Sequence, residues 1–321
     1  MTKLNITSPS LACLTLVVAA AITISANAQS QQLAIDRQVR PASLGRSAPR
    51  SPAQSVQFAR RPSQIGDQVE QMIAHEMQLT TKWRQGNEIV NTTTAAAKNH
   101  QRRLVSTTQV VNGRTQAVLL RYLEAADQRS SSEQQPETSQ PTTSPVVGKA
   151  YRCQRDGEKL IITDEQGNAP PPDEFEIVSA DLESVGRPSP LAEFLGGRTV
   201  AVGETLSVPV EMADRVLGLQ SKFGKLTRFD LTLREVRLEG GAQCAVFQAS
   251  IEAVSNDSSQ LRMIVSGPLV VQLDTCRAVR TSLAGPIAMS ESRGSYSASF
   301  QLISTGKLSM NIAATYRDAT R

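Results

Sequence analysis

The sequence predicts an α+β fold that is dominated by a curved antiparallel β-sheet, half-barrel-like, with one or two short helices. Apolar and polar residues alternate through most of the last hundred positions, and Gly- or Asn-containing turns separate the alternating runs. Helices are predicted only in two short segments near the middle of the chain. A sheet that is buried on one face produces this combination.

The first 28 residues have the three parts of a secretory signal peptide. Lys3 is their only charge, an apolar run extends from Leu11 to Ile24, and Ala26-Asn27-Ala28 places small residues at −3 and −1. The run is shorter than the roughly 20 residues that span a bilayer, which favours a cleaved signal over a retained anchor. We therefore expect an exported protein, periplasmic or extracellular, with no transmembrane segment after cleavage.

Residues 29–62 are expected to form a disordered basic arm that is rich in Pro, Ser, Gln and Arg. The arm contains six arginines against one acidic residue, Asp36, and few apolar residues that could offset the entropy of ordering. Such an arm could contact anionic lipid head groups or serve only as a solvated linker, and the composition leaves both interpretations open.

Residues 63–126 are predicted to form an N-terminal antiparallel β lobe. Asn112-Gly113 lies between two β-branched runs and is a strong hairpin signal, and Gly86-Asn87 marks an earlier turn. Residues 65–86 also fit a helical period in part, but strand is preferred because the neighbouring runs need a partner.

A polar segment at residues 127–146 is expected to be a disordered loop that separates this lobe from a main β domain at 147–321. Within that domain, short helices are predicted near 173–182, where acidic residues follow three prolines, and near 211–219.

The alternation in the main domain also predicts where strands bend. Phe229, Leu231 and Leu233 share one parity and Val236 the other, which indicates a bulge near Arg234-Glu235. The last strand keeps even parity from residue 296 to 316, and Gly306 lies where a bend costs least.

A bent sheet with a helical cover encloses either a hollow or a filled core. The apolar residues predicted to line a hollow for a ligand are Leu231, Leu233, Phe247, Phe300, Leu302, Met310 and Ile312.

Three cysteines follow the signal segment, namely Cys153, Cys244 and Cys276. Cys244 and Cys276 each lie beside a strand-like run, and a disulfide between them would stabilise the fold by about 3–4 kcal/mol. Three buried thiols that pack as small apolar residues are the alternative.

Catalytic motifs are missing from the sequence. It has two histidines, His75 and His100, and no H-E-x-x-H, C-x-x-C, G-x-S-x-G or phosphate-binding glycine motif. We therefore predict no catalytic, cofactor-binding or metal-binding residues and no cofactor. A single tryptophan and 4% aromatic residues also argue against nucleic-acid binding.

Two groups of carboxylates are still considered. Asp274-Thr275 resembles the D-T-G loop of aspartic proteases, but Cys276 replaces the glycine and the chain has no second copy. Acidic residues between 173 and 183 could supply calcium ligands, yet they lack the spacing of a calcium loop.

The chain resembles a group of exported bacterial β proteins that have no assigned activity. The resemblance is carried by Arg198–Thr205, similar to a V-x-V-G-[DE]-[ST] signature, by the predicted helix at 211–219, by Leu233–Val236, by the strand after Cys244, and by Gly66-Asp67. It implies export and a long-stranded β architecture and adds no catalytic residue. At the level of fold alone, a bent sheet with a helical lid also resembles the half-barrel of periplasmic lipoprotein carriers.

These features lead to three functional hypotheses. The first is a noncatalytic envelope or secreted protein, not an enzyme, that binds a partner or an apolar ligand, either a lipid or an envelope protein. The second is a secreted hydrolase with an improvised carboxylate site that uses Asp274 or the acids at 173–183. The third is a surface-assembly protein that is docked by its basic arm.

Overall fold

The computed structural model describes residues 54–132, 140–217, 225–255, 260–293 and 300–319. The predicted signal peptide and residues 29–53 of the predicted arm lie outside the described residues.

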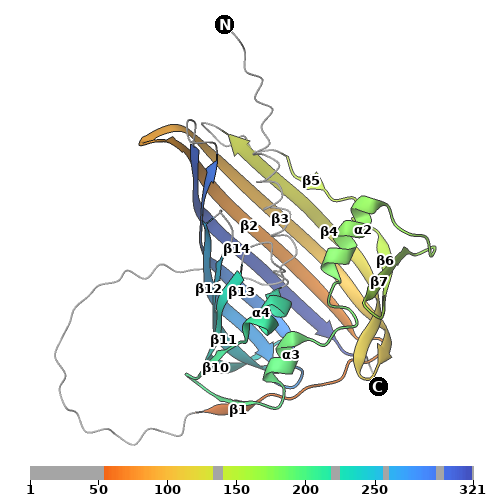
Figure 1. The fold of residues 1–321 in the computed structure, drawn as a ribbon. Helices are drawn as coiled ribbons and strands as arrows, with labels where there is room; N and C mark the ends of the chain where they lie inside the picture. The colour runs from red at the N-terminus through yellow and green to blue at the C-terminus, as the bar shows by residue number, and fades with distance from the viewer. Residues whose placement is uncertain (1–53, 133–139, 218–224, 256–259, 294–299, 320–321) are drawn as a thin grey trace, which may run out of the picture.

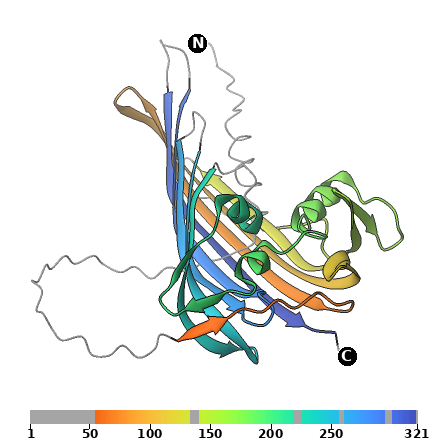
Figure 2. The ribbon, with the colours of Figure 1, turned by 60° about the horizontal axis from the view of Figure 1, so that its bottom comes forward.

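Twelve strands form one antiparallel sheet in the order β7-β6-β4-β3-β2-β14-β13-β12-β11-β10-β9, with β5 paired to β4. The strands are β2 (Gln68–Gln85), β3 (Glu88–Val111), β4 (Arg114–Ser132), β5 (Thr142–Thr143), β6 (Ala150–Asp156), β7 (Lys159–Asp164), β9 (Thr205–Ser207), β10 (Lys225–Glu239), β11 (Ala242–Val254), β12 (Gln260–Gln272), β13 (Ala278–Arg293) and β14 (Phe300–Arg317). A second, two-stranded sheet pairs β1 (Ser55–Gln57) with β8 (Thr199–Ala201). The large sheet is strongly bent, and the helices lie on its concave side (Figures 1 and 2). The predicted β-dominated α+β fold with a curved antiparallel sheet is confirmed.

The N-terminal strands belong to the same sheet as the C-terminal strands. β14 pairs with β2 from Phe300 opposite Gln85 to Arg317 opposite Gln68, and its other edge pairs with β13. The predicted division between a lobe at 63–126 and a main domain at 147–321 is therefore not a break in the sheet. The alternation of apolar and polar residues along a strand shows which face of that strand is buried. It does not show which other strands pair with it, so the pairing of β14 with β2 could not be predicted.

Two segments that were predicted to be disordered are partly folded. The described end of the basic arm contains β1 and the buried Phe58, which is 1% exposed. In the predicted polar loop at 127–146, β4 continues to Ser132, and Thr142–Thr143 return as β5 beside it. Pairing with a long neighbouring strand offsets the ordering entropy that composition alone suggested would dominate.

The two predicted helices correspond to α2 (Pro172–Asp181) and α4 (Val210–Leu217). The sequence did not predict α3 (Pro190–Leu195), which has only six residues. Pro190 stands at its first turn, and the Ser189 hydroxyl accepts a 3.4 Å hydrogen bond from the Ala192 backbone N–H. Helices this short are too brief to show a helical period in the sequence. Among the described residues, no helix has the length and apolar character needed to cross a membrane.

Local sequence features account for a bulge and for two close approaches between strands in the sheet. The register of β10 against β11 shifts between Leu233 and Glu235, which confirms the predicted bulge. A Cβ atom on Gly306 would overlap the carbonyl oxygen of Gln78, and one on Gly285 would overlap that of Ile264. Both positions therefore need glycine, and the strands can approach and coil sharply there.

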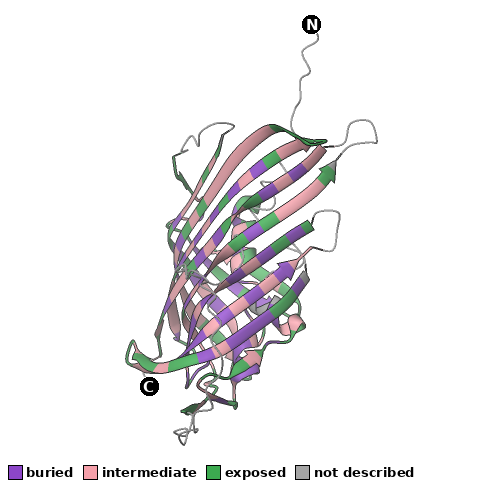
Figure 3. Ribbon diagram, turned by 90° about the vertical axis from the view of Figure 1, so that its left-hand side faces the viewer, coloured by how far each residue is buried: buried purple, intermediate pink, exposed green. Residues whose placement is uncertain are grey.

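Two hydrophobic clusters occupy the concave side. The first core lies over β10–β14 and includes Leu231, Phe247, Ile251 and residues of α3 and α4. The second core lies between β4, β6 and α2 and includes Leu120, Tyr122, Tyr151 and Val178. Figure 3 shows how buried and less buried residues alternate along the strands that carry these cores.

Candidate functional site

The residues predicted to line a hollow occupy two different environments. Leu231, Leu233 and Phe247 are 0% exposed within the first core, and the Phe58 ring stacks on Phe247 at a centroid distance of 5.9 Å. Met310 is buried in the same core, and Ile312 packs against it in a partly buried position. The chain's own N-terminal segment therefore fills the part of the concave side where we expected a ligand.

Several backbone hydrogen bonds fix that N-terminal segment. The Phe58 N–H donates to the Arg198 carbonyl at 2.9 Å, and the Ala59 N–H donates to the Leu273 carbonyl at 2.7 Å. The Cys276 thiol also donates to the Ala59 carbonyl at 3.0 Å. A lone phenylalanine within an Arg- and Pro-rich arm was the only sequence signal for this anchor.

Phe300 and Leu302 lie farther along β14, toward its N-terminal end. They belong to what we call the distal face, the concave-side residues nearest the β2–β3 turn. The distal face comprises Thr81 and Trp83 of β2, Asn91, Thr93, Ala95 and Ala97 of β3, Met289 and Glu291 of β13, and Phe300, Leu302 and Ser304 of β14. In Figure 1 this part of β2, β3 and β14 extends beyond the three labelled helices.

Small side chains occupy the β3 side of the distal face. Leu302 is paired across the strands with Trp83, whereas the β3 side of the same surface carries Thr93, Ala95 and Ala97. The β2 and β14 side is mostly buried, and the β3 residues are only half-buried. Alanine and threonine on the inner side of a bent sheet leave volume that leucine or phenylalanine would fill.

The two buried hydroxyls of the distal face are satisfied by each other. The Thr81 and Ser304 hydroxyls, both buried, are hydrogen-bonded to each other at 2.8 Å. Because these hydroxyls already have partners, this part of the face offers mainly apolar contact to anything that approaches it.

A polar network bounds the distal face on the side of α2. The Asp181 carboxylate accepts hydrogen bonds from the Tyr122 hydroxyl at 2.6 Å and from the Gln101 amide at 2.7 Å, and it forms an ion pair with Arg103 at 2.9 Å. Arg103 also donates to the Gln71 side chain at 2.9 Å. Burial, followed by the negative charge of Asp181, raises the pKa of Tyr122. This network holds the end of α2 on the sheet.

The start of α2 is held in a similar way. Glu174 is buried and accepts hydrogen bonds from Lys149 and from the Tyr151 hydroxyl, each at 2.5 Å. Burial alone would raise the pKa of Glu174, but the hydrogen bonds from Lys149 and Tyr151 outweigh it and lower that pKa below the ordinary value.

The carboxylates considered for a hydrolase do not converge. Asp274 is exposed at the β12–β13 turn, where the Thr275 hydroxyl donates to the Gln272 side chain and Cys276 has a φ of +53°. Among the α2 acids, Asp173 is exposed, and Glu174 and Asp181 are engaged as described above. The D-T-C sequence is therefore a tight turn, and no shared cleft contains both groups of acids. No group of three or more metal-ligating side chains is found in the part of the chain that the structure describes.

The three cysteines are free thiols in the structure. Cys244 lies with Val246 and Val270 in a small cluster of its own, while Cys276 belongs to the first core. Of the two alternatives, the structure has three buried thiols and not a Cys244–Cys276 disulfide, and the two side chains pack in different clusters. Burial raises the pKa of Cys276 to about 11 and that of Cys153 to about 12.

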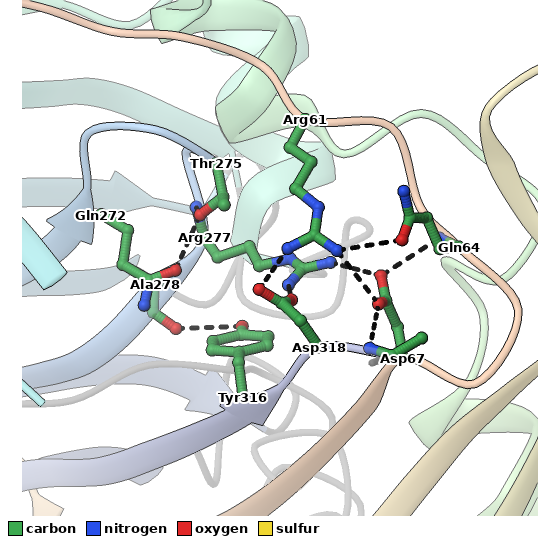
Figure 4. Close-up of polar contacts among 10 residues, drawn as sticks. Arg61, Gln64, Asp67, Gln272, Thr275, Arg277, Ala278, Tyr316 and Asp318 are labelled. Carbon is green, nitrogen blue, oxygen red and sulfur yellow. Dashed lines mark hydrogen bonds and ion pairs between the residues drawn. The ribbon is translucent and has the colours of Figure 1, made fainter. Parts of the chain in front are cut away.

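Sequence reasoning missed a charged clasp that joins distant parts of the chain (Figure 4). Arg277 forms ion pairs with Asp67 at 2.8 Å and with Asp318 at 2.9 Å, and Arg61 pairs with the same two carboxylates. The Arg277 guanidinium also lies over the Tyr316 ring, 5.0 Å from its centroid. The clasp ties the N-terminal segment, the β12–β13 turn and the end of β14 together, and its residues are too far apart in sequence to form a motif.

Comparisons with known proteins give no family. No protein-family model matches the chain, and no curated protein matches it either. Distant structural similarity links it to a structure described as lipid-protein interactions in lipovitellin, with 8% identity over 80% of this chain and a TM-score of 0.35. The chain spans 26% of that lipovitellin chain.

Two further solved structures are more distant. The translocator domain of the autotransporter NalP from Neisseria meningitidis has 11% identity, covers 77% of this chain and 89% of its own, and gives a TM-score of 0.18. The Pseudomonas aeruginosa MucA/MucB complex has 10% identity, covers 73% and 88%, and gives a TM-score of 0.10. At these scores none of the three identifies a function for this chain.

Proposed function

We propose that this chain is an exported, noncatalytic binding protein whose distal face holds an apolar ligand, such as an acyl chain. The observation that carries the proposal is the row of small side chains on β3, Thr93, Ala95 and Ala97, facing the apolar row of β2 and β14. An apolar chain placed along this row would contact alanine and leucine and remove apolar surface from water, which favours binding. The signal-like first 28 residues support export to the periplasm or the extracellular space.

A binding role fits the chemistry better than a hydrolytic one. Glu174, which is buried, and Asp181, which is half-buried, each accept hydrogen bonds that hold α2 in place, so a structural role accounts for both carboxylates. The exposed Asp274 has no companion carboxylate from α2 beside it. The surface-assembly hypothesis depends mainly on arm residues 29–53, which lie outside the described part of the chain, and the described Arg61 is engaged in the clasp.

A filling substitution tests the proposal. Ala95→Phe places a ring on the distal face, while Ala96→Phe places the same ring on the opposite side of β3, because successive residues of a strand face opposite ways. We expect oleate to change the emission of Trp83, the chain's single tryptophan, in the wild type and in Ala96→Phe but not in Ala95→Phe. Equal oleate binding by the two variants would contradict a ligand site on this face.

Native mass spectrometry of the protein purified from its own host provides a second measurement. A co-purifying lipid in the wild type that is lost in Ala95→Phe would support the proposal. A ligand-free wild type that also fails to respond to oleate would leave the distal face as part of a packed core.

A further inference from the structure

The tip of the β2–β3 hairpin exposes two neighbouring aliphatic side chains. Ile89 is 56% exposed and Val90 is 51% exposed. Arg84 is paired with Ile89 and Trp83 with Asn91, so Val90 is an extra residue in a β-bulge. The bulge places two adjacent apolar residues at the tip where regular alternation would turn one of them inward.

Cationic side chains without carboxylate partners flank this apolar pair. Arg84 donates a 3.2 Å hydrogen bond to the neutral Asn87 side chain. Within the described ranges, no carboxylate lies within ion-pair distance of Lys82 or Arg84. By contrast, Arg102 in the middle of β3 is held by two glutamates, Glu70 at 2.7 Å and Glu124 at 3.1 Å.

The tip of the β10–β11 hairpin provides a contrast with the β2–β3 tip. Leu238, near the β10–β11 turn, is 72% exposed, but the cation beside it is neutralised. Arg237 pairs with Glu235 at 2.9 Å and with Glu239 at 3.0 Å. Both tips expose an aliphatic side chain, and only the β2–β3 tip combines it with unneutralised positive charge.

We propose that the β2–β3 tip docks on a lipid surface that carries anionic head groups. Ile89 and Val90 would enter the acyl boundary, Lys82 and Arg84 would meet the head groups, and the half-buried Trp83 indole would lie at the interface between them. A narrow hairpin tip offers far less than the roughly 800 Å² per partner of a stable protein–protein interface, so a lipid surface suits it better than a folded protein. The inference does not require the distal face to hold a ligand.

Trp83 makes the docking measurable at the tip itself. The full chain is mixed with vesicles of phosphatidylglycerol and brominated phosphatidylcholine, and quenching of Trp83 by the bromine atoms is recorded. We expect quenching with these vesicles, at least tenfold weaker partitioning for the double variant Ile89→Asp/Val90→Asp, and wild-type partitioning for the matched tip variant Leu238→Asp. Lys82→Gln/Arg84→Gln should weaken binding to phosphatidylglycerol vesicles and remove its salt dependence.

Three results would overturn the proposal. The first is no quenching of the wild type by the anionic vesicles, and the second is equal quenching in Ile89→Asp/Val90→Asp. The third is loss of quenching in Ala95→Phe, because that variant blocks only the distal face and would show that lipid reached Trp83 by being taken up there. Retained vesicle quenching with lost oleate binding in Ala95→Phe supports docking and ligand binding as separate properties.

Discussion

At the α3–α4 end of the concave side, Phe58 stacks on Phe247 among apolar core residues, whereas at the α2 end Tyr122 and Tyr151 donate hydrogen bonds to carboxylates of the helix. Both ends bury a helix against the same sheet. The first is held by dispersion and the exclusion of water, and the second depends on two ionised side chains. The comparison indicates that protonation acts directly on the contacts that hold α2, whereas the stacking of Phe58 on Phe247 involves no ionisable group.

The largest expected effect comes from emptying the apolar end. Phe247→Ala should lower the free energy of unfolding by about 3–5 kcal/mol, because it removes a fully buried ring and the stacking partner of Phe58. Urea denaturation followed by circular dichroism measures the loss. Phe175→Ala, on the exposed side of α2, is the control, and an equal loss in both variants would contradict a filled core.

A smaller loss is expected at the polar end. Asp181→Asn keeps the shape of the side chain but removes the charge that Arg103, Tyr122 and Gln101 share, and it should cost about 2–3 kcal/mol. Asp173→Asn on the same helix is exposed and should be neutral. If urea midpoints for the two variants coincide, the network does not hold α2.

The pH dependence sharpens the contrast further. Since the folded-state pKa of Glu174 is lowered from 4.5, its stabilisation is complete above the unfolded pKa and is lost as pH falls through the folded value. We therefore expect unfolding free energy to decrease below about pH 4.5, with part of that slope absent in Glu174→Gln. An identical acid limb in the wild type and the variant would contradict this assignment.

The smallest expected effect is a change in the labelling rate of the buried thiols. These rates measure how often each end of the concave side opens. Cys153 lies in the second core and Cys276 in the first, and the pKa of each thiol is well above neutral, so labelling at pH 8 should be slow in both. In Asp181→Asn, labelling of Cys153 should accelerate and that of Cys276 should not, as peptide mapping would show. Equal acceleration would mean that the two ends open together.

The sequence was sufficient for features that depend on neighbouring residues. The parity change around Arg234 predicted a bulge, and Asn112-Gly113 predicted a hairpin, because both signals are local. It could not show that Arg277 meets Asp67, or that Phe58 fills the space over Phe247, because these contacts join residues about 200 positions apart. The distal face was only partly predicted, since alternation identified Phe300 and Leu302 on β14 but not the small β3 residues opposite them.

The pairing of β14 between β2 and β13 also has a consequence for how the chain reaches this structure. Strands β2–β4 and β10–β13 are synthesised before β14, yet the two groups share no ladder until it arrives. Until β14 pairs, β2 and β13 each have an unpaired edge. Contacts between residues so far apart in sequence slow folding, and the unpaired edges are prone to aggregation. Assistance from a chaperone would be most useful in the interval before residues 300–317 emerge.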